Sequence, residues 1–142
     1  MIEFSSDVRP SMALELEPHQ GQKLQAPLSP DNLYALTSAG PAWAVRLDGK
    51  LVAIGGHTPL WPGRTALWGY LAGDCGPALP VMTRRVRKEV AALAVEFSRI
   101  EAYAERHHEQ GNRWLLMLGF KKEGVMRKFA NNRDYVLYAR TR

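Results

Sequence analysis

One passage of the sequence constrains the fold more than any other, because it places a helical pattern between two strand-like segments. Within residues 81–97 five apolar residues recur at spacings of three and four, the spacing of one helix face. These residues are Met82, Val86, Val90, Leu93 and Phe97. The segments 64–73 and 98–105 on either side are predicted strands. Since a strand–helix–strand passage requires a crossover, the two strands are expected to lie parallel.

The segment before the first hairpin is predicted to hold a strand and a helix. Residues 14–20 alternate weakly between apolar and polar, which favours a first strand. Residues 26–40 read as a helix: Ser29 and Pro30 are typical of a helix start, and Gly40 followed by proline is typical of its end.

A β-hairpin is the clearest local signal of the first half. Within residues 42–58 two apolar runs flank Asp48-Gly49, a preferred tight turn because both residues tolerate positive φ. The breaker-rich stretch 59–63 then separates this hairpin from the run 64–73. Three consecutive antiparallel strands are therefore expected.

The C-terminal part is predicted to contain a short helix and a second hairpin. Residues 108–118 are amphipathic, and Gly119 is a typical left-handed helix cap. Residues 124–140 read as two strands joined by a turn at 130–134. Phe120, directly after the cap, is expected to be buried.

Size and composition favour one domain, residues 1–142, that is 46% hydrophobic and 23% charged. No apolar run approaches the roughly 20 residues of a membrane span, and the N-terminus lacks the pattern of a signal peptide. The lone Cys75 excludes an internal disulfide and fits a reducing compartment. We expect a soluble, cytoplasmic protein that does not bind a membrane.

The charge is unevenly distributed. Residues 81–142 carry 14 Lys/Arg against 7 Asp/Glu, whereas residues 1–80 carry 5 against 7. A basic half suggests an anionic partner, such as a phosphate-bearing cofactor, nucleic acid or an acidic protein, or serves solubility alone. Nucleic acid is the least favoured partner, because no recognition helix or RNA-binding motif is present.

The order of elements and the C-terminal motifs resemble those of the GCN5-related N-acetyltransferase (GNAT) superfamily. The motifs are Leu118-Gly119-Phe120, Glu123-Gly124 and the final strand 134–140. The sequence looks particularly like short acetyltransferase-like proteins of phages and prophages, some similar to an internal virion protein of T7-like phages. The resemblance implies a single-domain α+β fold. Its sheet of six to seven strands is largely antiparallel, with parallel fourth and fifth strands and helices on both faces.

The resemblance also implies a cofactor, acetyl-CoA, with its pyrophosphate at the start of the central helix. The family has an Arg/Gln-x-x-Gly-x-Gly/Ala run there, whereas this chain has GDCGPALPVMTRR at 73–85. Gly76 is present, but Pro77 and Pro80 each remove a donor and no second glycine follows at the right spacing. The implied cofactor-binding residues are Leu71, Ala72, Gly73, Gly76, Arg84, Arg85 and His108.

The basic residues of the first two helical turns allow two interpretations. They are Arg84, Arg85, Arg87 and Lys88. Either their charge compensates for the missing backbone donors, or they form a solvated helix face.

Candidate catalytic residues follow from the same resemblance. The family's tyrosine acid corresponds here to Leu115, its asparagine to His108, and its strand carboxylate to Tyr103. Tyr103, His108 and Glu105 are therefore the catalytic candidates. The alternatives are an exposed His107-His108 loop and a half-buried strand aromatic at Tyr103.

Trp68 and Tyr70, two residues apart on one strand, are candidates for a substrate groove, with core packing as the alternative. No metal is expected, because the histidines and Cys75 lack metal-ligand spacing.

Two functions remain open on this basis. The first is an N-acyltransferase that moves an acetyl group from acetyl-CoA to an unidentified amine. The second is a catalytically degenerate phage protein of the same fold, with a virion-assembly or host-interaction role. It would bind a phage or host protein in the bacterial cytoplasm or in the virion. The sequence leaves the oligomeric state open.

Overall fold

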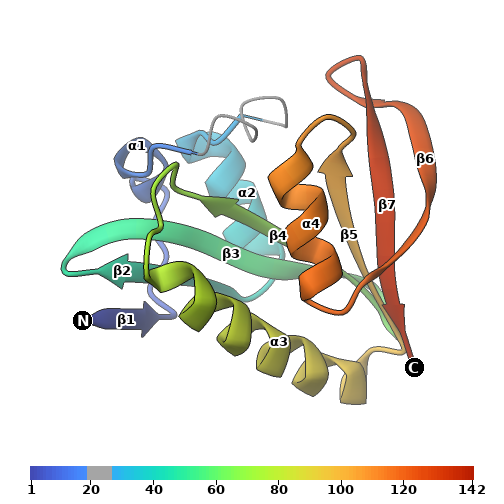
Figure 1. The fold of residues 1–142 in the computed structure, drawn as a ribbon, viewed down its shortest axis with the longest axis horizontal. Helices are drawn as coiled ribbons and strands as arrows, with labels where there is room; N and C mark the ends of the chain where they lie inside the picture. The colour runs from blue at the N-terminus through green and yellow to red at the C-terminus, as the bar shows by residue number, and fades with distance from the viewer. Residues whose placement is uncertain (19–26) are drawn as a thin grey trace.

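A computed structural model describes residues 1–18 and 27–142. In these residues seven strands form one sheet in the order β1-β2-β3-β4-β5-β7-β6 (Figure 1). The strands are β1 (Ile2–Ser5), β2 (Ala42–Leu47), β3 (Lys50–Trp61), β4 (Arg64–Leu71), β5 (Arg99–Glu105), β6 (Lys121–Ala130) and β7 (Arg133–Thr141). The helices are α1 (Met12–Glu15), α2 (Pro30–Ala39), α3 (Ala78–Glu96) and α4 (Glu109–Met117).

The predicted crossover is confirmed. Strands β4 and β5 pair in parallel, and α3 connects them, whereas every other pair of neighbouring strands is antiparallel. In Figure 1, α3 and α4 lie in front of the sheet and α2 lies behind it. The α+β GNAT fold is therefore the fold of this chain, with seven strands, one parallel pair and helices on both faces.

Both predicted hairpins are confirmed, and each closes on two residues with positive φ. Asp48 and Gly49 have φ of +50° and +85°, and Asn131 and Asn132 have +52° and +59°. Positive φ at both central residues gives the turn a twist that matches the flanking strands. Gly119 has φ of +96°, as expected of a left-handed cap.

The predicted helix 26–40 is confirmed as α2, which begins at Pro30; residue 26 lies outside the described residues. The Ser29 hydroxyl accepts a hydrogen bond from the Asn32 amide at 3.1 Å, which satisfies one of the donors left at a helix start. The prediction of a strand at 14–20 is wrong. Residues 12–15 form the short helix α1, Pro18 makes an isolated bridge to Ala72, and residues 19–20 lie outside the described residues.

Two further boundaries differ from the prediction. The first strand is Ile2–Ser5, which is too short for its alternation to stand out. The breaker-rich stretch 59–63 separates two strands as predicted, but only Pro62 and Gly63 form the turn, because β3 continues to Trp61. The register shifts between Pro59 and Trp61, and a shift of this kind accommodates a proline in a sheet.

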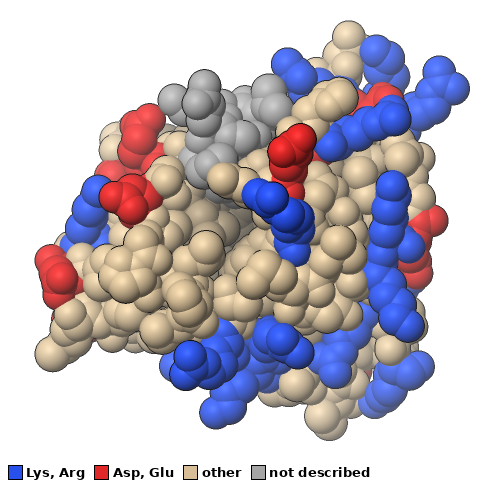
Figure 2. Space-filling view, viewed as in Figure 1, with Lys and Arg blue, Asp and Glu red and all other residues tan. Residues whose placement is uncertain are grey.

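The predicted apolar face of α3 packs on the sheet. Met82, Val86 and Val90 are buried, and Phe120 is 2% exposed. The basic residues of α3 named above are exposed, and Figure 2 shows Lys and Arg gathered along the lower edge of this view, over α3. None of the helices in the described part of the chain has the length and apolar character that crossing a membrane requires.

Candidate active site

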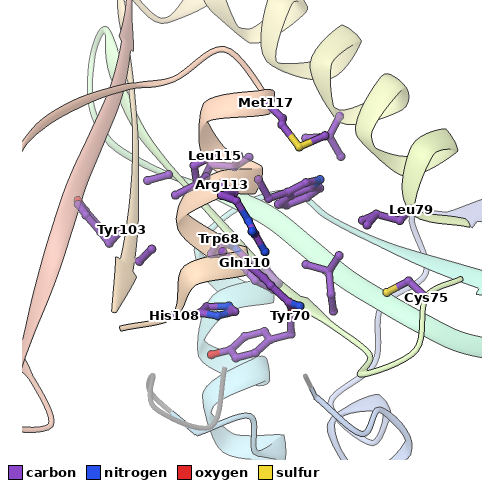
Figure 3. A pocket seen from close by; sticks show the side chains of 18 of the residues that line it. Trp68, Tyr70, Cys75, Leu79, Tyr103, His108, Gln110, Arg113, Leu115 and Met117 are labelled. Atoms are coloured by element: carbon purple, nitrogen blue, oxygen red, sulfur yellow. The ribbon is translucent and has the colours of Figure 1, made fainter. Parts of the chain in front are cut away.

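A cavity opens where the parallel strands separate. Strands β4 and β5 pair only from Arg64/Arg99 to Leu67/Ala102, although β4 continues to Leu71 and β5 to Glu105. Beyond this pairing a cavity of about 740 Å³ lies between the strands, bounded also by α3, α4 and the loop that leads into α3 (Figure 3). Figure 2 shows a hollow near the middle of this face. The resemblance implied a cleft between these two strands, and the structure places its start after Leu67 and Ala102.

The split gives the cavity two sides. Residues that pair across β4, β5 and β7 share a face of the sheet, so Leu67, Ala102 and Ala104 point toward α3 and α4, where all three pack. By alternation, Trp68 and Tyr103 point to the opposite face. The cavity is lined from both faces, so it passes through the sheet.

A hydrogen-bonded pair holds the helical wall. Trp114 Nε1 of α4 donates to Thr83 Oγ1 of α3 at 2.8 Å, and that hydroxyl donates to the Leu79 carbonyl at 2.8 Å. This bond joins the two helices beside the cavity, which Leu79 and Trp114 both line. The link was missed from sequence, because apolar periodicity says nothing about which polar groups meet.

Four of the residues predicted to bind cofactor line the cavity. They are Leu71 at the end of β4 and, in the loop before α3, Ala72, Gly73 and Gly76. The amides of Ala78 and Leu79 donate to the carbonyls of Cys75 and Gly76 at 3.0 and 3.3 Å, and the prolines at 77 and 80 have no amide hydrogen. Within residues 1–18 and 27–142, the amides of residues 74–76 have no backbone acceptor. Three successive amides beside the start of α3 thus have no backbone partner among the described residues.

The same loop carries groups that bear on anion binding. The Asp74 side chain lines the cavity and is unfavourable to a phosphate. Burial raises the pKa of the Cys75 thiol, whose sulfur hydrogen-bonds the Ala72 carbonyl at 3.3 Å, so this thiol is protonated at neutral pH. Gly76-Pro77-Ala78 matches the Gly-x-Gly/Ala part of the family's pattern, because alanine is allowed at the last position.

The two arginines predicted to bind cofactor do not line the cavity. Arg84 is exposed on α3, and Arg85 lies over the Phe4 ring at 4.7 Å and pairs with Glu89 at 3.2 Å. The charged side chains that line the cavity, among the described residues, are Asp74 and Arg113 of α4.

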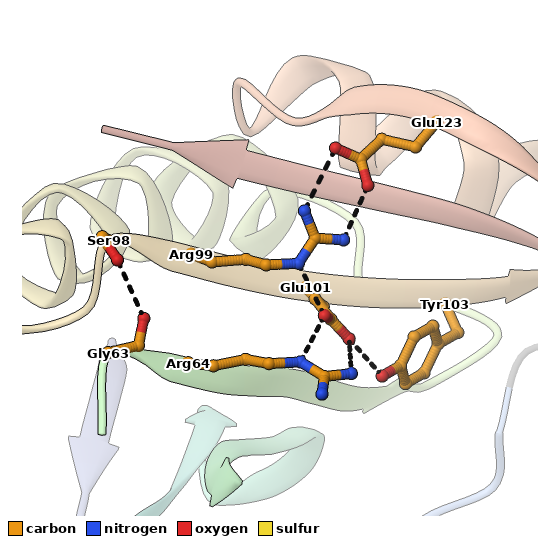
Figure 4. Close-up of polar contacts among 7 residues, drawn as sticks. All are labelled: Gly63, Arg64, Ser98, Arg99, Glu101, Tyr103 and Glu123. Atoms are coloured by element: carbon orange, nitrogen blue, oxygen red, sulfur yellow. Dashed lines mark hydrogen bonds and ion pairs between the residues drawn. The ribbon is translucent and has the colours of Figure 1, made fainter. Parts of the chain in front are cut away.

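A polar cluster closes the cavity where β4 and β5 still pair (Figure 4). The Glu101 carboxylate, 3% exposed, accepts hydrogen bonds from Arg64 Nε at 2.6 Å, Arg99 Nε at 2.7 Å and the Tyr103 hydroxyl at 2.6 Å. Arg99 also makes two hydrogen bonds to Glu123, which ties β5 to the edge strand β6.

The cluster fixes two protonation states. Burial alone would raise the pKa of Glu101, but the hydrogen bonds from Arg64, Tyr103 and Arg99 outweigh it and lower this pKa to about 2. Burial and the hydrogen bond to Glu101 raise the pKa of Tyr103 to about 12. The Tyr103 phenol, which lines the cavity, therefore stays protonated at neutral pH with its proton directed to Glu101.

His108 lies at the cavity wall as the residue before α4 and is 6% exposed, so the exposed-loop alternative fails for His108, although His107 is exposed. Its ring lies against Gly111: a Cβ there would approach His108 Cδ2 at 2.5 Å and Nε2 at 2.6 Å. The Asn112 side chain donates to the carbonyls of Glu105 and His108 at 3.0 and 2.8 Å and accepts from the Tyr138 hydroxyl at 2.7 Å. This network fixes the turn that carries His108.

Glu105 does not line the cavity. It is 1% exposed, and its carboxylate accepts a hydrogen bond from the His107 amide at 2.8 Å and lies 3.9 Å from Arg133. Tyr103 and His108 are thus brought to the cavity, and Glu105 lies behind the turn that holds His108.

The groove candidates Trp68 and Tyr70 both line the cavity, with ring centroids 6.3 Å apart. Trp68 lies over Gly56, where a Cβ would come within 2.9 Å of its ring. The Trp68 Nε1 atom is buried and has no acceptor among the described residues. Leu115, at the position of the family's tyrosine, lines the cavity without a proton to give.

The strand part of the cavity fits the pantetheine arm of a coenzyme A thioester, because its lining is mostly apolar. The loop before α3 offers the amides of residues 74–76 for a pyrophosphate and Arg113 as the nearby cation. The residues present therefore fit the group, with fewer backbone donors than a glycine-rich loop provides.

The fold is that of solved GNAT acetyltransferases, such as one from Streptococcus pneumoniae that matches with a TM-score of 0.70 and 15% identity over 100% of both chains. The ribosomal-protein-S5-alanine acetyltransferase of Vibrio fischeri has the same fold, with a TM-score of 0.69 and 17% identity over 99% of this chain and 92% of that one. The aminoglycoside acetyltransferase AAC(6')-Ib, solved with coenzyme A, matches with a TM-score of 0.72 and 14% identity, over 100% and 95% of the two chains. The Salmonella typhimurium protein YncA, solved with its cofactor acetyl-CoA, matches with a TM-score of 0.67 and 15% identity, over 99% and 93%.

No protein-family model matches the sequence, and no curated protein matches it. At these identities the similarity establishes the fold of this chain, whereas the substrate of each solved protein belongs to that protein.

Proposed function

We propose that the protein is an N-acetyltransferase that transfers an acetyl group from acetyl-CoA to an amine. The observation that carries the proposal is the separation of β4 and β5 after Leu67 and Ala102, which opens a cavity of about 740 Å³ through the sheet. A cavity that reaches both faces lets a donor and an acceptor meet from opposite sides. The structural similarity to proteins solved with acetyl-CoA and with coenzyme A supports this donor. An enzyme of this kind works in the cytoplasm, where acetyl-CoA is formed.

Acetyl-CoA, when bound, supplies the acetyl group as a thioester. Leu71, Ala72, Gly73 and Gly76 line the donor side and hold the arm and the pyrophosphate through the strand edge and the loop amides. Arg113, at the mouth of the cavity on α4, pairs with a phosphate. Arg84 and Arg85 lie outside the cavity and act on the approach of an anion through their charge.

His108 is the proposed proton carrier, because an imidazole exchanges protons near neutral pH and this one lies at the cavity wall. The Tyr103 hydroxyl donates a hydrogen bond to Glu101, so its oxygen can accept a hydrogen bond from the amine and orient it. Glu105 acts through the turn: its carboxylate holds the His107 amide and thereby positions His108.

The direct test is a thermal melt with acetyl-CoA. A ligand at a hundredfold over its Kd adds about 2.7 kcal/mol to the free energy of unfolding, which raises the Tm of a chain of this size by roughly 5–10 °C. Absence of a shift at millimolar acetyl-CoA would overturn the proposal.

A matched pair of glycine variants locates the binding. Gly69 lines the cavity, and an added Cβ meets only the Ile54 carbonyl oxygen at 3.8 Å, an ordinary contact. Gly124 on β6 lies outside the cavity with open space around an added Cβ. We expect Gly69→Leu to remove the acetyl-CoA shift and Gly124→Leu to keep it. Equal shifts in both variants would place the ligand elsewhere.

The alternative function is a catalytically degenerate protein of this fold with a virion-assembly or host-interaction role in a phage. It is favoured by the loop before α3, where prolines and Asp74 leave few groups for a pyrophosphate. This alternative requires a stable complex with a phage or host protein and no acetyl-CoA shift. Coexpression with the neighbouring genes, followed by size exclusion, separates the two functions and also gives the oligomeric state.

A further inference from the structure

The face of the sheet opposite α3 and α4 presents a set of aromatic rings to the cavity. Tyr103 of β5 and Tyr135 of β7 share this face by register, and Phe129 of β6 packs against both, with ring centroids 5.2 and 5.4 Å away. Trp68 and Tyr70 of β4 form the other side of the split. All five rings line the cavity.

The backbone of β6 directs Phe129 into this set. The register between β6 and β7 is irregular from Met126 to Ala130, and Lys128 has φ of +53°. The Lys128 amide donates to Asp134 Oδ1 at 3.1 Å, which holds the irregular stretch. Phe129 therefore lies on Tyr103 and Tyr135 although 48% of it is exposed. An irregular strand that directs a side chain toward a cavity is a feature of binding sites.

Among the described residues, no carboxylate lines the cavity from this aromatic face. Of the described residues that line the cavity, Asp74 is the carboxylate, and it lies in the loop before α3, on the donor side. Glu101 lies on the aromatic face, but two guanidinium groups and a phenol already occupy its carboxylate. An acceptor with several ammonium groups loses hydration when it binds, and paired carboxylates are needed to offset that cost. Among the described residues, this face has no carboxylate that lines the cavity.

We propose that the acceptor of the acetyl group is a primary monoamine carried on an aromatic body, an arylalkylamine, and that this inference rests on the proposed function. The aromatic body packs among Phe129, Tyr135 and Trp68, in the tilted arrangements that aromatic rings prefer. The amine lies toward Tyr103 and His108. Its nitrogen bonds to the acetyl carbon, the carbon–sulfur bond breaks, and the proton that the nitrogen loses ends on the released thiol.

Two measurements on the full chain test the inference. The first is thiol release from acetyl-CoA with 2-phenylethylamine or with spermidine as acceptor. We expect kcat/KM for 2-phenylethylamine to exceed that for spermidine by tenfold or more. The second is calorimetric binding of 2-phenylethylamine to the protein alone, which needs no turnover.

Phe129→Ala is the informative variant, because its side chain is half exposed and its removal leaves the core intact. Loss of the Phe129 ring from the surface on which the amine's aromatic body is proposed to pack is expected to weaken 2-phenylethylamine binding roughly tenfold. Val125→Ala, an exposed residue of the same strand outside the cavity, is the control and is expected to leave binding unchanged.

The outcomes separate the two proposals. If acetyl-CoA raises the Tm but spermidine is acetylated as fast as 2-phenylethylamine, or if Phe129→Ala binds the amine as tightly as the wild type, the arylalkylamine inference is overturned and the acetyltransferase stands. If 2-phenylethylamine binds in a Phe129-dependent way but acetyl-CoA does not bind, the aromatic amine site is supported and the transferase is overturned.

Discussion

Glu101→Gln tests the polar cluster that closes the split between β4 and β5. In the folded protein the pKa of Glu101 is about 2, against 4.5 for an ordinary glutamate. Each pKa unit corresponds to about 1.4 kcal/mol, so the ionised carboxylate adds about 3 kcal/mol to the free energy of unfolding at pH 7. Arg64 and Arg99 remain about a third exposed, and solvent screening brings the expected loss in Glu101→Gln to about 2–3 kcal/mol.

The sign of the pH dependence follows from the lowered pKa. A carboxylate with a lowered folded-state pKa stabilises the protein above pH 4.5, and this contribution is lost as the pH falls toward 2. The difference in unfolding free energy between wild type and Glu101→Gln should therefore be full at pH 7 and less than half as large at pH 3. Urea unfolding followed by tryptophan fluorescence at several pH values measures it.

Glu89→Gln is the matched control, because Glu89 pairs with Arg85 at 3.2 Å on the exposed face of α3. An exposed pair four residues apart contributes about 0.3–0.5 kcal/mol, so this variant should lose little stability at any pH. If the Glu101→Gln difference is the same at pH 3 as at pH 7, the carboxylate is not held ionised by the two arginines, and the reasoning about the cluster is refuted.

Three further substitutions test other parts of the site. Gly111→Ala brings a methyl group 2.5 Å from the His108 ring, so the ring must move by about 1 Å. We expect turnover to fall about a hundredfold while the Tm changes by a few degrees. An unchanged rate would exclude His108 from the chemistry. Trp114→Phe removes the hydrogen bond to Thr83 between α3 and α4 and should cost about 1 kcal/mol in urea unfolding, with weaker acetyl-CoA binding; full retention of both would show that the bond does not hold the wall. Gly119→Ala should cost about 1 kcal/mol from backbone strain alone, since φ is +96° and an added Cβ has open space; equal stability would mean that the helix end relaxes.

The sequence predicted the parts of the fold that local patterns determine. Asp48-Gly49 marked one hairpin, Gly119 marked a helix end, and the periodicity from Met82 to Phe97 marked the crossover helix. The failures occurred where the local signal was weak or ambiguous. The strand Ile2–Ser5 has four residues, and its place in the sheet depends on pairing with β2, which is far along the chain.

The site was predictable as a location but less so as a set of contacts. Alternation along β4 correctly grouped Trp68 with Tyr70. Sequence alone did not show that Tyr103 donates a hydrogen bond to Glu101. This bond depends on Glu101 being ionised, which requires Arg64 of β4 and Arg99 of β5 to lie beside it. Arg85 lies over Phe4, a ring about eighty residues earlier, and no spacing rule reports such a contact.

The alternation of side chains along β4 and β5 also affects how substitutions can accumulate in the cavity during evolution. Consecutive codons in these strands encode residues on opposite faces of the split sheet, such as Leu67 and Trp68. A mutant library randomised at every second codon of these strands would therefore alter the residues that line the cavity on one face of the sheet. The residues on the other face would stay unchanged. Natural drift has the same freedom, so residues that line the cavity on one face can change while those on the other face stay as they are.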